Sequence, residues 1–250
     1  MSLDWPIGYG KRVLAEVDST NAEAARVASD LAGPEWILGL VQTAGRGRRG
    51  RDWKAPEGNF AATLVMRPSE TPDQVALRSF VAALALFDAL EAATGRTEWL
   101  SLKWPNDVLL KGGKVAGILL ESAGLGSGVG HIAIGIGVNL ASAPPRAELE
   151  ETAMQPVSVF AETGVKLSPE EFLNLLAPSY ARHEETFRTY GFAPLRELWL
   201  ARAAKLGEVI TARTMRDEVT GTFETVDTQG NLVLKTAKGR EVIPAADIFF

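Results

Sequence analysis

The sequence predicts an α+β protein, in which a mixed β-sheet flanked by helices precedes a small C-terminal β-barrel. Over most of the chain, apolar strand-like segments alternate with helical ones. Segment 79–93 is almost wholly apolar, which is typical of a helix buried against a sheet. From Leu206 onward, short alternating segments between turns predict a barrel of about 45 residues, SH3-like in size. We therefore expect two domains, residues 1–204 and 205–250.

Composition narrows the class of protein. A chain of 250 residues that is 46% hydrophobic can bury a sizeable core. The absence of cysteine excludes disulfides and thiolate chemistry, and two distant histidines, His131 and His183, argue against a histidine-built metal site. A net charge of -5 does not favour a general nucleic-acid binder. No apolar run is long enough to span a membrane and the N-terminus does not resemble a signal peptide, so we expect a cytoplasmic protein without a membrane partner.

The N-terminal part predicts strands joined by one helix. Thr20 and Glu23 fit a capping box, and an apolar stripe then continues to a stop at Gly33-Pro34. The simplest interpretation of Ser19-Thr20-Asn21 is a helix cap, but a helix N-terminus also suits a carbonyl or an anion. The strands are expected at residues 11–17, 36–43 and 58–67.

The middle of the chain predicts strands joined by short turns. One turn holds Pro105-Asn106-Asp107, and another spans residues 111–114. The strands are expected at residues 100–104, 108–110, 115–121 and 131–138, with a glycine- and serine-rich turn at 124–130.

The last third predicts two helices before the barrel. Ser168-Pro169-Glu170-Glu171 is a strong helix start, and the helix should reach about residue 190, kinked or split at Pro178. A shorter helix at 194–202 should pack Leu195, Leu198 and Trp199. The strands of the barrel are expected at residues 209–212, 219–226, 232–235 and 241–243.

The most unusual segment is Thr43–Lys54, hereafter the arginine loop. Between Gly45 and Lys54 it carries five basic side chains, one acidic side chain and three glycines. Glycine lets a backbone turn sharply and approach a ligand closely, and arginine presents a planar fork of donors to carboxylate or phosphate oxygens. The arginine loop therefore indicates an anion clamp.

Three interpretations of the arginine loop compete. Gly45, Gly47 and Gly50 satisfy a dinucleotide-binding G-x-G-x-x-G pattern, but Pro56 and Gly58 argue against the helix that this pattern requires. The loop also resembles an arm that grips nucleic acid, or a flap that closes over a small anion.

Other polar groups stand at predicted strand ends. Gln42 precedes the arginine loop, Asn106 and Asp107 lie in a turn, and Lys114 follows a hairpin. Each has an ordinary interpretation as a turn former or an edge residue. There is no nucleophilic triad and no phosphate-binding P-loop motif. Arginines, a lysine and few acids suit phosphoryl or adenylyl chemistry, so we expect an enzyme that binds anions and handles a nucleotide.

These segments resemble the biotin protein ligases, and the resemblance covers nearly the whole chain. It implies the fold of class II synthetases and of biotin and lipoate ligases. The arginine loop together with Lys103–Asp107 is its most specific part, since lipoate ligases share the fold but lack the loop. The matching segments are Gly45–Trp53, Lys103–Asp107, Gly113–Glu121, Ser19–Asn21, Gln42 and Gly135–Asn139.

The resemblance implies an AMP-forming reaction in two steps, with ATP and Mg²⁺ required and biotin as substrate. The biotin carboxylate attacks the α-phosphate of ATP, and biotinyl-5′-AMP and pyrophosphate form. A lysine of a biotin carboxyl carrier protein then takes the biotinyl group as an amide, and AMP leaves.

The resemblance also implies residue roles. Catalytic roles fall to Arg46, Arg48 and Lys114. Biotin contacts fall to Ser19, Thr20, Asn21, Gln42, Arg46, Gly47, Arg48, Lys114 and Gly117. ATP contacts fall to Arg49, Arg51, Trp53, Lys103, Asn106, Asp107 and Asn139, with Asn106 and Asp107 also near Mg²⁺.

Two departures from the family matter. Some members carry an N-terminal helix-turn-helix domain, but here the first strand begins almost at once, so we expect a monofunctional ligase that binds no nucleic acid. Phe60-Ala61-Ala62 replaces bulkier residues, which alters the pocket wall. The alternatives are a lipoate or octanoate ligase of the same fold and a nucleic-acid-binding module. The sequence leaves the oligomeric state open, with a homodimer among the options.

Overall fold

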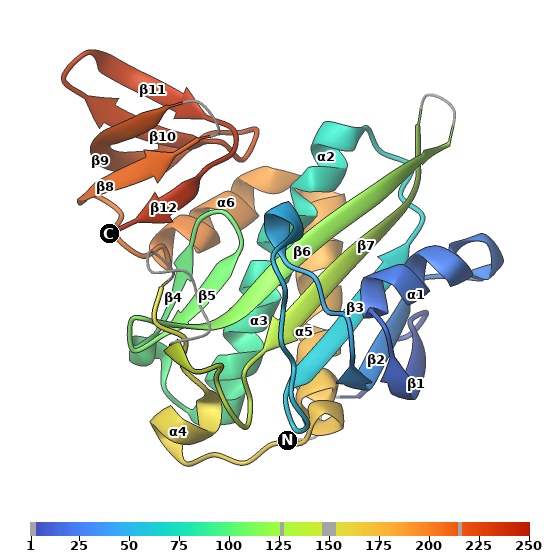
Figure 1. The fold of residues 1–250 in the computed structure, drawn as a ribbon. Coiled ribbons are helices and arrows are strands. Elements are labelled where there is room, and N and C mark those ends of the chain that lie inside the picture. Colours follow the sequence, from blue (N-terminus) through green and yellow to red (C-terminus); the bar gives the residue numbers. More distant parts are fainter. Residues whose placement is uncertain (1–3, 126–127, 147–153, 215–216) are drawn as a thin grey trace.

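The centre of the computed structural model is a seven-stranded sheet, and the model describes residues 4–125, 128–146, 154–214 and 217–250 (Figure 1). The strand order is β1-β2-β3-β7-β6-β5-β4. β1 and β2 are parallel and every other neighbouring pair is antiparallel, so the predicted mixed sheet is confirmed. The strands are β1 (Gly10–Val17), β2 (Glu35–Gln42), β3 (Phe60–Met66), β4 (Leu100–Lys103), β5 (Asp107–Leu110), β6 (Gly113–Leu125) and β7 (Gly128–Val138).

Two helices, α3 (Arg78–Thr94) and α5 (Pro169–Tyr190), cover one face of the sheet, behind it in Figure 1, and α6 (Phe192–Ala201) packs against both of them. The predicted capping box of Ser168 with Glu171 starts α5. The helix continues through Pro178, so of the expected kink or split the split is wrong and the kink stays a prediction. In α6, Leu195 and Trp199 are buried, but Leu198 is 42% exposed, so its predicted packing is also wrong.

Helix α1 (Thr20–Val27) lies on the opposite face, followed by a short 3-10 turn at Ala28–Asp30. Ser19 caps this helix by accepting a hydrogen bond from the Ala22 N–H. The expected capping box of Thr20 with Glu23 is therefore wrong by one residue, because adjacent Ser and Thr are both good caps. The shift frees the Thr20 side chain to face the sheet.

Alternation along the strands places small and polar residues on the face that carries α1. On β3 and β7, bulky side chains such as Leu64 and Ile134 enter the main core, while Thr63 and Gly135 face the other way and pair in register. This face is left partly open by the short helix α1. The segment between β2 and β3, which contains the arginine loop, crosses it in front of β6 and β7 (Figure 1).

The last five strands form a separate antiparallel sheet, so the predicted all-β C-terminal unit is confirmed. The turn of this sheet that contains Gly230 contacts the main part of the chain, because Trp104, which follows β4, donates its Nε1–H to Gly230 O at 3.0 Å. Arg196 Nη2 of α6 donates to Thr225 Oγ1 at 2.9 Å, and the two units share one hydrophobic core cluster. The strands are β8 (Val209–Arg213), β9 (Glu218–Val226), β10 (Leu232–Thr236), β11 (Gly239–Ile243) and β12 (Asp247–Phe249).

The sequence did not predict three short elements: α2 (Pro72–Ala76), α4 (Val159–Thr163) and β12. Part of the expected turn at 124–130 belongs to β6 and β7, and residues 126–127 lie outside the described residues. No helix within the described residues is long and apolar enough to cross a membrane.

Candidate active site

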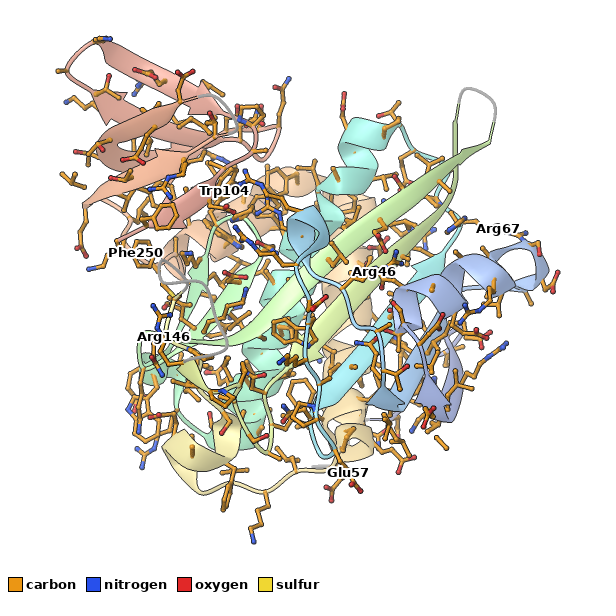
Figure 2. All side chains as sticks on the ribbon, in the orientation of Figure 1. Arg46, Glu57, Arg67, Trp104, Arg146 and Phe250 are labelled. Carbon is orange, nitrogen blue, oxygen red and sulfur yellow. The ribbon has the colours of Figure 1, made fainter. Side chains whose placement is uncertain are left out.

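A cavity of about 880 Å³ lies between the open face of the sheet, the arginine loop and the C-terminal strand β12. That volume is suitable for a small ligand and part of a nucleotide. Figure 2 shows Arg46 over this face, and Trp104 and Phe250 where the C-terminal sheet meets it. The cavity is lined by fifteen of the sixteen predicted site residues: Ser19, Thr20, Asn21, Gln42, Arg46, Gly47, Arg48, Arg51, Trp53, Lys103, Asn106, Asp107, Lys114, Gly117 and Asn139.

The floor of the cavity consists of small residues in register. Ala61, Gly137 and Gly117 stand side by side on β3, β7 and β6. The Trp53 indole lies on this floor: a Cβ on Gly137 would overlap with it, and one on Gly117 would lie 3.4 Å from its Cζ3. The sequence indicated Gly117 as the space-making glycine, but Gly137 is the more sterically demanding of the two.

The arginine loop is folded back on itself. Gly47 N donates to Arg51 O at 2.7 Å, and Trp53 N donates to Gly45 O at 3.0 Å. A 3-10 turn at Arg48–Gly50 closes its tip, with Arg49 in the left-handed region at φ 56°. No helix begins here, so the dinucleotide-binding interpretation is wrong; the next helix in the chain is α2.

The loop arginines contact three different elements. Arg46 approaches Glu121 on β6 at 3.7 Å, and Arg48 Nη1 donates to Asn106 Oδ1 at 3.3 Å. Arg49 is not among the lining residues, but it pairs at 2.7 Å with Asp247 on β12, which is one of them. Arg51 pairs with the same carboxylate at 3.1 Å. The loop is thereby tied to both the main sheet and the C-terminal sheet.

Lys114 lies at the centre of the charged end. Its Nζ is 2.7 Å from Asp107 Oδ1, and Lys103 Nζ is 3.9 Å from Asp107 Oδ2. The Lys114 backbone is fixed on both sides, because its N–H donates to Gln155 O and its carbonyl accepts from Val157 N. Burial lowers the pKa of Lys103, with Asp107 opposing the shift. Burial also lowers the pKa of the half-buried Arg48.

The other end of the cavity holds a buried polar cluster. The Thr20 N–H donates to Gln42 Oε1 at 2.9 Å, and Thr20 Oγ1 lies 3.2 Å from the same oxygen. Asn21 Nδ2 donates to Glu121 Oε2 at 2.7 Å, and Ser19 is 4% exposed. The ordinary interpretation of Ser19 as a cap is correct, and its neighbours additionally line the cavity.

The asparagines at the strand ends are engaged by the protein. Asn106 Nδ2 donates to Ile118 O at 2.7 Å, while its oxygen accepts from Arg48. Asn139 Nδ2 donates to Val157 O at 3.1 Å. Among the described residues, no group of three or more His, Cys, Asp or Glu side chains could hold a metal ion. Asp107, a carboxylate at this end, already lies beside two lysines.

Sequence reasoning missed four residues of the site: Thr63, Glu121, Asp247 and Phe250. Thr63 is fully buried and contacts Thr20 and Asn21. Its signal was a lone hydroxyl inside the apolar strand Phe60–Met66. Phe250 lines the cavity, and the Lys103 ammonium lies 5.5 Å from its ring.

The charge of the cavity indicates its chemistry. Its lining contains six basic residues, Arg46, Arg48, Arg51, Lys54, Lys103 and Lys114, against three acidic ones, Asp52, Asp107 and Asp247. Preorganised cations in a partly enclosed site stabilise anions and the charge that develops during group transfer. One end of the cavity is therefore built for anions, and the other for a ligand with polar groups.

A mixed sheet beside a small all-β C-terminal unit is an architecture that this chain shares with solved structures of biotin protein ligases. Residues 13–139 match the biotin/lipoate A/B protein ligase family, and residues 205–250 match the biotin protein ligase C terminal domain. The chain belongs to the biotin/lipoate A/B protein ligase family.

Two curated relatives and one solved structure illustrate the similarity. The chain is 58% identical to a biotin–[acetyl-CoA-carboxylase] ligase of Paracoccus denitrificans, over 95% of this chain and 99% of that one. It is 33% identical to the bifunctional ligase/repressor BirA of Bacillus spizizenii, over 93% of this chain and 71% of that one. The biotin protein ligase from Aquifex aeolicus in complex with biotin and ATP matches with a TM-score of 0.79 and 25% identity, over 96% of this chain and 97% of that chain.

Proposed function

We propose that this protein is an ATP-dependent biotin–protein ligase that forms biotinyl-5′-AMP and transfers the biotinyl group to a lysine of a biotin carboxyl carrier protein. The observation that carries the proposal is the cavity, in which a cation-rich flap faces a polar cluster across a glycine floor. The similarity to the Paracoccus ligase over almost the full length of both chains supports the same activity.

The first step joins two anions. A biotin carboxylate oxygen attacks the α-phosphorus of ATP, the bond to the bridging oxygen breaks, and pyrophosphate leaves with that electron pair. The reactants repel each other, so cations must lie along their path. Arg46, Arg48 and Lys114 line the cavity together, and we assign them to the carboxylate and the α-phosphate. Each charge-assisted hydrogen bond contributes about 1.5–3 kcal/mol.

The second step transfers the acyl group. The uncharged amine of the acceptor lysine attacks the acyl carbon of the adenylate, the bond from that carbon to the phosphate oxygen breaks, and AMP leaves. The amine loses its extra proton as the amide forms. Until the acceptor arrives, the mixed anhydride must be kept from water. The arginine loop lies over the cavity and is suited to that protection.

The remaining site residues divide between the two ligands. We assign Ser19, Thr20, Asn21 and Gln42 to the polar ring end of biotin, with Gly47 and Gly117 leaving room beside it. We assign Arg49, Arg51, Trp53, Lys103, Asn106, Asp107 and Asn139 to the nucleotide end. Arg49 does not line the cavity here, so its role in this proposal requires it to leave Asp247 when phosphates bind.

Mg²⁺ fits this site as a companion of ATP. Magnesium commonly takes most of its ligands from phosphates and water, with one or two carboxylates from the protein. At the nucleotide end, the Asp247 carboxylate pairs with Arg49 and Arg51, and both polar atoms of Asn106 are engaged by Arg48 and Ile118, which favours Asp107. Mg²⁺ bound with ATP would neutralise phosphate charge, and we propose that Asp107 would hold it.

The proposal also concerns partners and location. The acceptor is a carrier domain, nucleic acid is not a partner, and a homodimer is one option for the assembly. ATP as co-substrate and a carboxylase as acceptor favour the cytoplasm as the working compartment.

The test is reconstitution. The purified protein, ATP, Mg²⁺, biotin and a carrier domain should yield one biotinylated lysine, detected as a mass increase by intact-protein mass spectrometry. A carrier with its acceptor lysine replaced by arginine is the matched control and should stay unmodified. No product with biotin, or a preference for lipoate or octanoate in direct competition, would reject the proposal in favour of the related ligase.

A further inference from the structure

We propose that Thr63 is a positioning residue that sets the direction of the hydrogen bonds at the ring end of the cavity, and thereby selects ligands that carry N–H donors. This inference rests on the proposed function and deepens it. It concerns a residue that neither the sequence motifs nor the mechanism above employs.

Thr63 connects residues from two elements. It lies on β3, is 0% exposed, and faces α1 across the open side of the sheet. Its Oγ1 is 2.6 Å from Asn21 Oδ1 and 2.8 Å from Thr20 Oγ1. A hydroxyl has one proton, so it can donate to only one of these oxygens.

Asn21 decides which oxygen receives the proton. Its amide nitrogen faces two acceptors, the Glu121 carboxylate at 2.7 Å and Leu119 O at 3.4 Å, so the NH₂ group must point that way. The amide oxygen therefore faces Thr63, and an amide oxygen only accepts. Gly135 makes room for this amide, because a Cβ there would overlap with it. Thr63 must donate to Asn21.

The direction of the Thr63–Asn21 hydrogen bond also determines which of Thr63 and Thr20 donates to the other. The single Thr20 hydroxyl proton has two oxygens within reach, Thr63 Oγ1 at 2.8 Å and Gln42 Oε1 at 3.2 Å. Because the Thr63 proton is committed to Asn21, the closer Thr63–Thr20 contact needs the Thr20 proton, and we assign Thr20 as its donor. Thr20 then presents only lone pairs to the cavity. Gln42 Oε1, held by the Thr20 N–H at 2.9 Å, lies 3.2 Å from Thr20 Oγ1. The cavity thus presents two acceptor oxygens side by side.

A pair of acceptors complements a ligand with N–H donors. The cyclic urea of biotin carries two N–H groups, whereas the dithiolane ring of lipoate carries none. A polar site left unpaired by a ligand discriminates strongly against that ligand. The order of hydrogen bonds fixed by Thr63 therefore favours the urea and disfavours the dithiolane. Through Glu121, the same chain of contacts reaches Arg46 at 3.7 Å.

The test compares Thr63→Val, Thr63→Ser and wild type. Valine has nearly the shape of threonine without the hydroxyl, and serine keeps the hydroxyl. Calorimetry measures the Kd for biotin, desthiobiotin and lipoate, since desthiobiotin retains the cyclic urea but lacks the fused ring. Pyrophosphate release measures the KM for ATP. If Thr63→Val does not fold, Thr63→Ala against Thr63→Ser carries the same comparison.

We expect Thr63→Val to raise the Kd of biotin and of desthiobiotin about tenfold, with the KM for ATP unchanged. Thr63→Ser should stay within about twofold of wild type, because it restores the hydrogen bond. Wild-type affinity in the valine variant, an equal loss in the serine variant, or a parallel rise in the KM for ATP would overturn the assignment. Wild-type protein that binds neither biotin nor desthiobiotin would instead overturn the proposed function.

Discussion

Replacement of Lys114 by alanine should separate binding from chemistry. Lys114 Nζ lies 2.7 Å from Asp107 and lines the cavity, and the proposed function assigns it to the carboxylate and the α-phosphate. Loss of one preorganised donor to a developing charge costs about 2.7–4 kcal/mol, or about 100- to 1,000-fold in rate. An ordinary ground-state hydrogen bond contributes only about 0.5–1.5 kcal/mol, so the Kd for biotin should rise less than about tenfold.

The assay is rapid-quench measurement of adenylate formation, with biotin affinity determined separately by calorimetry. Lys111→Ala is the matched control, because it removes the same charge from the same hairpin outside the cavity. Lys114→Arg keeps the charge and should recover part of the rate. If Lys114→Ala lowers the adenylation rate and the biotin affinity by the same factor, the lysine serves binding rather than the transition state, and the reasoning is refuted.

Three further perturbations follow from the structure. Asp247→Asn removes the carboxylate shared by two arginines of the arginine loop, and because exposed ion pairs contribute about 0.2–1 kcal/mol each, the melting temperature should barely change. Cleavage by trypsin after Arg49 should become faster, and an unchanged cleavage rate would contradict the proposal that Asp247 tethers the loop. Gly137→Ala should displace Trp53 from the floor and weaken biotin binding more than Gly117→Ala does; equal effects would contradict the packing. Tyr9→Phe tests stability at alkaline pH. Burial, aided by the Glu184 charge, raises the pKa of Tyr9 to about 12. The neutral Tyr9 side chain therefore contributes fully to the free energy of unfolding below pH 10, and this contribution is lost as the pH rises through 12. The variant should show a smaller fall in unfolding free energy over that range, measured by urea titration, and an unchanged slope would contradict the assignment.

The sequence predicted most strands and the long helices because their patterns are long and regular. Segment 79–93 and the Ser168 capping box correspond to α3 and α5. Elements of three to five residues, such as β12, α2 and α4, carry too little periodicity to be recognised. The prediction also failed where two neighbours suit one role, as with Ser19 and Thr20 at the cap of α1.

The site was predictable as a set of residue types but not as a set of contacts. Polar groups at strand ends pointed to Gln42, Asp107 and Lys114, which the sheet order brings to one cavity. Asp247 could not be found, because its role depends on how the C-terminal sheet docks on the main one. Thr63 was hidden for a similar reason, since its partners come from a helix far away in the sequence.

The floor formed by Ala61, Gly137 and Gly117, which has no large side chain of its own, has a consequence for inhibitor design. A flat compound inserted between this floor and the Trp53 indole would contact main chain on one side and Trp53 on the other. Resistance usually arises by exchanging a contacting side chain, but here a larger residue at Gly137 would collide with the enzyme's own Trp53. Compounds that contact this strip of backbone should therefore leave few substitutions that weaken their binding without disturbing Trp53.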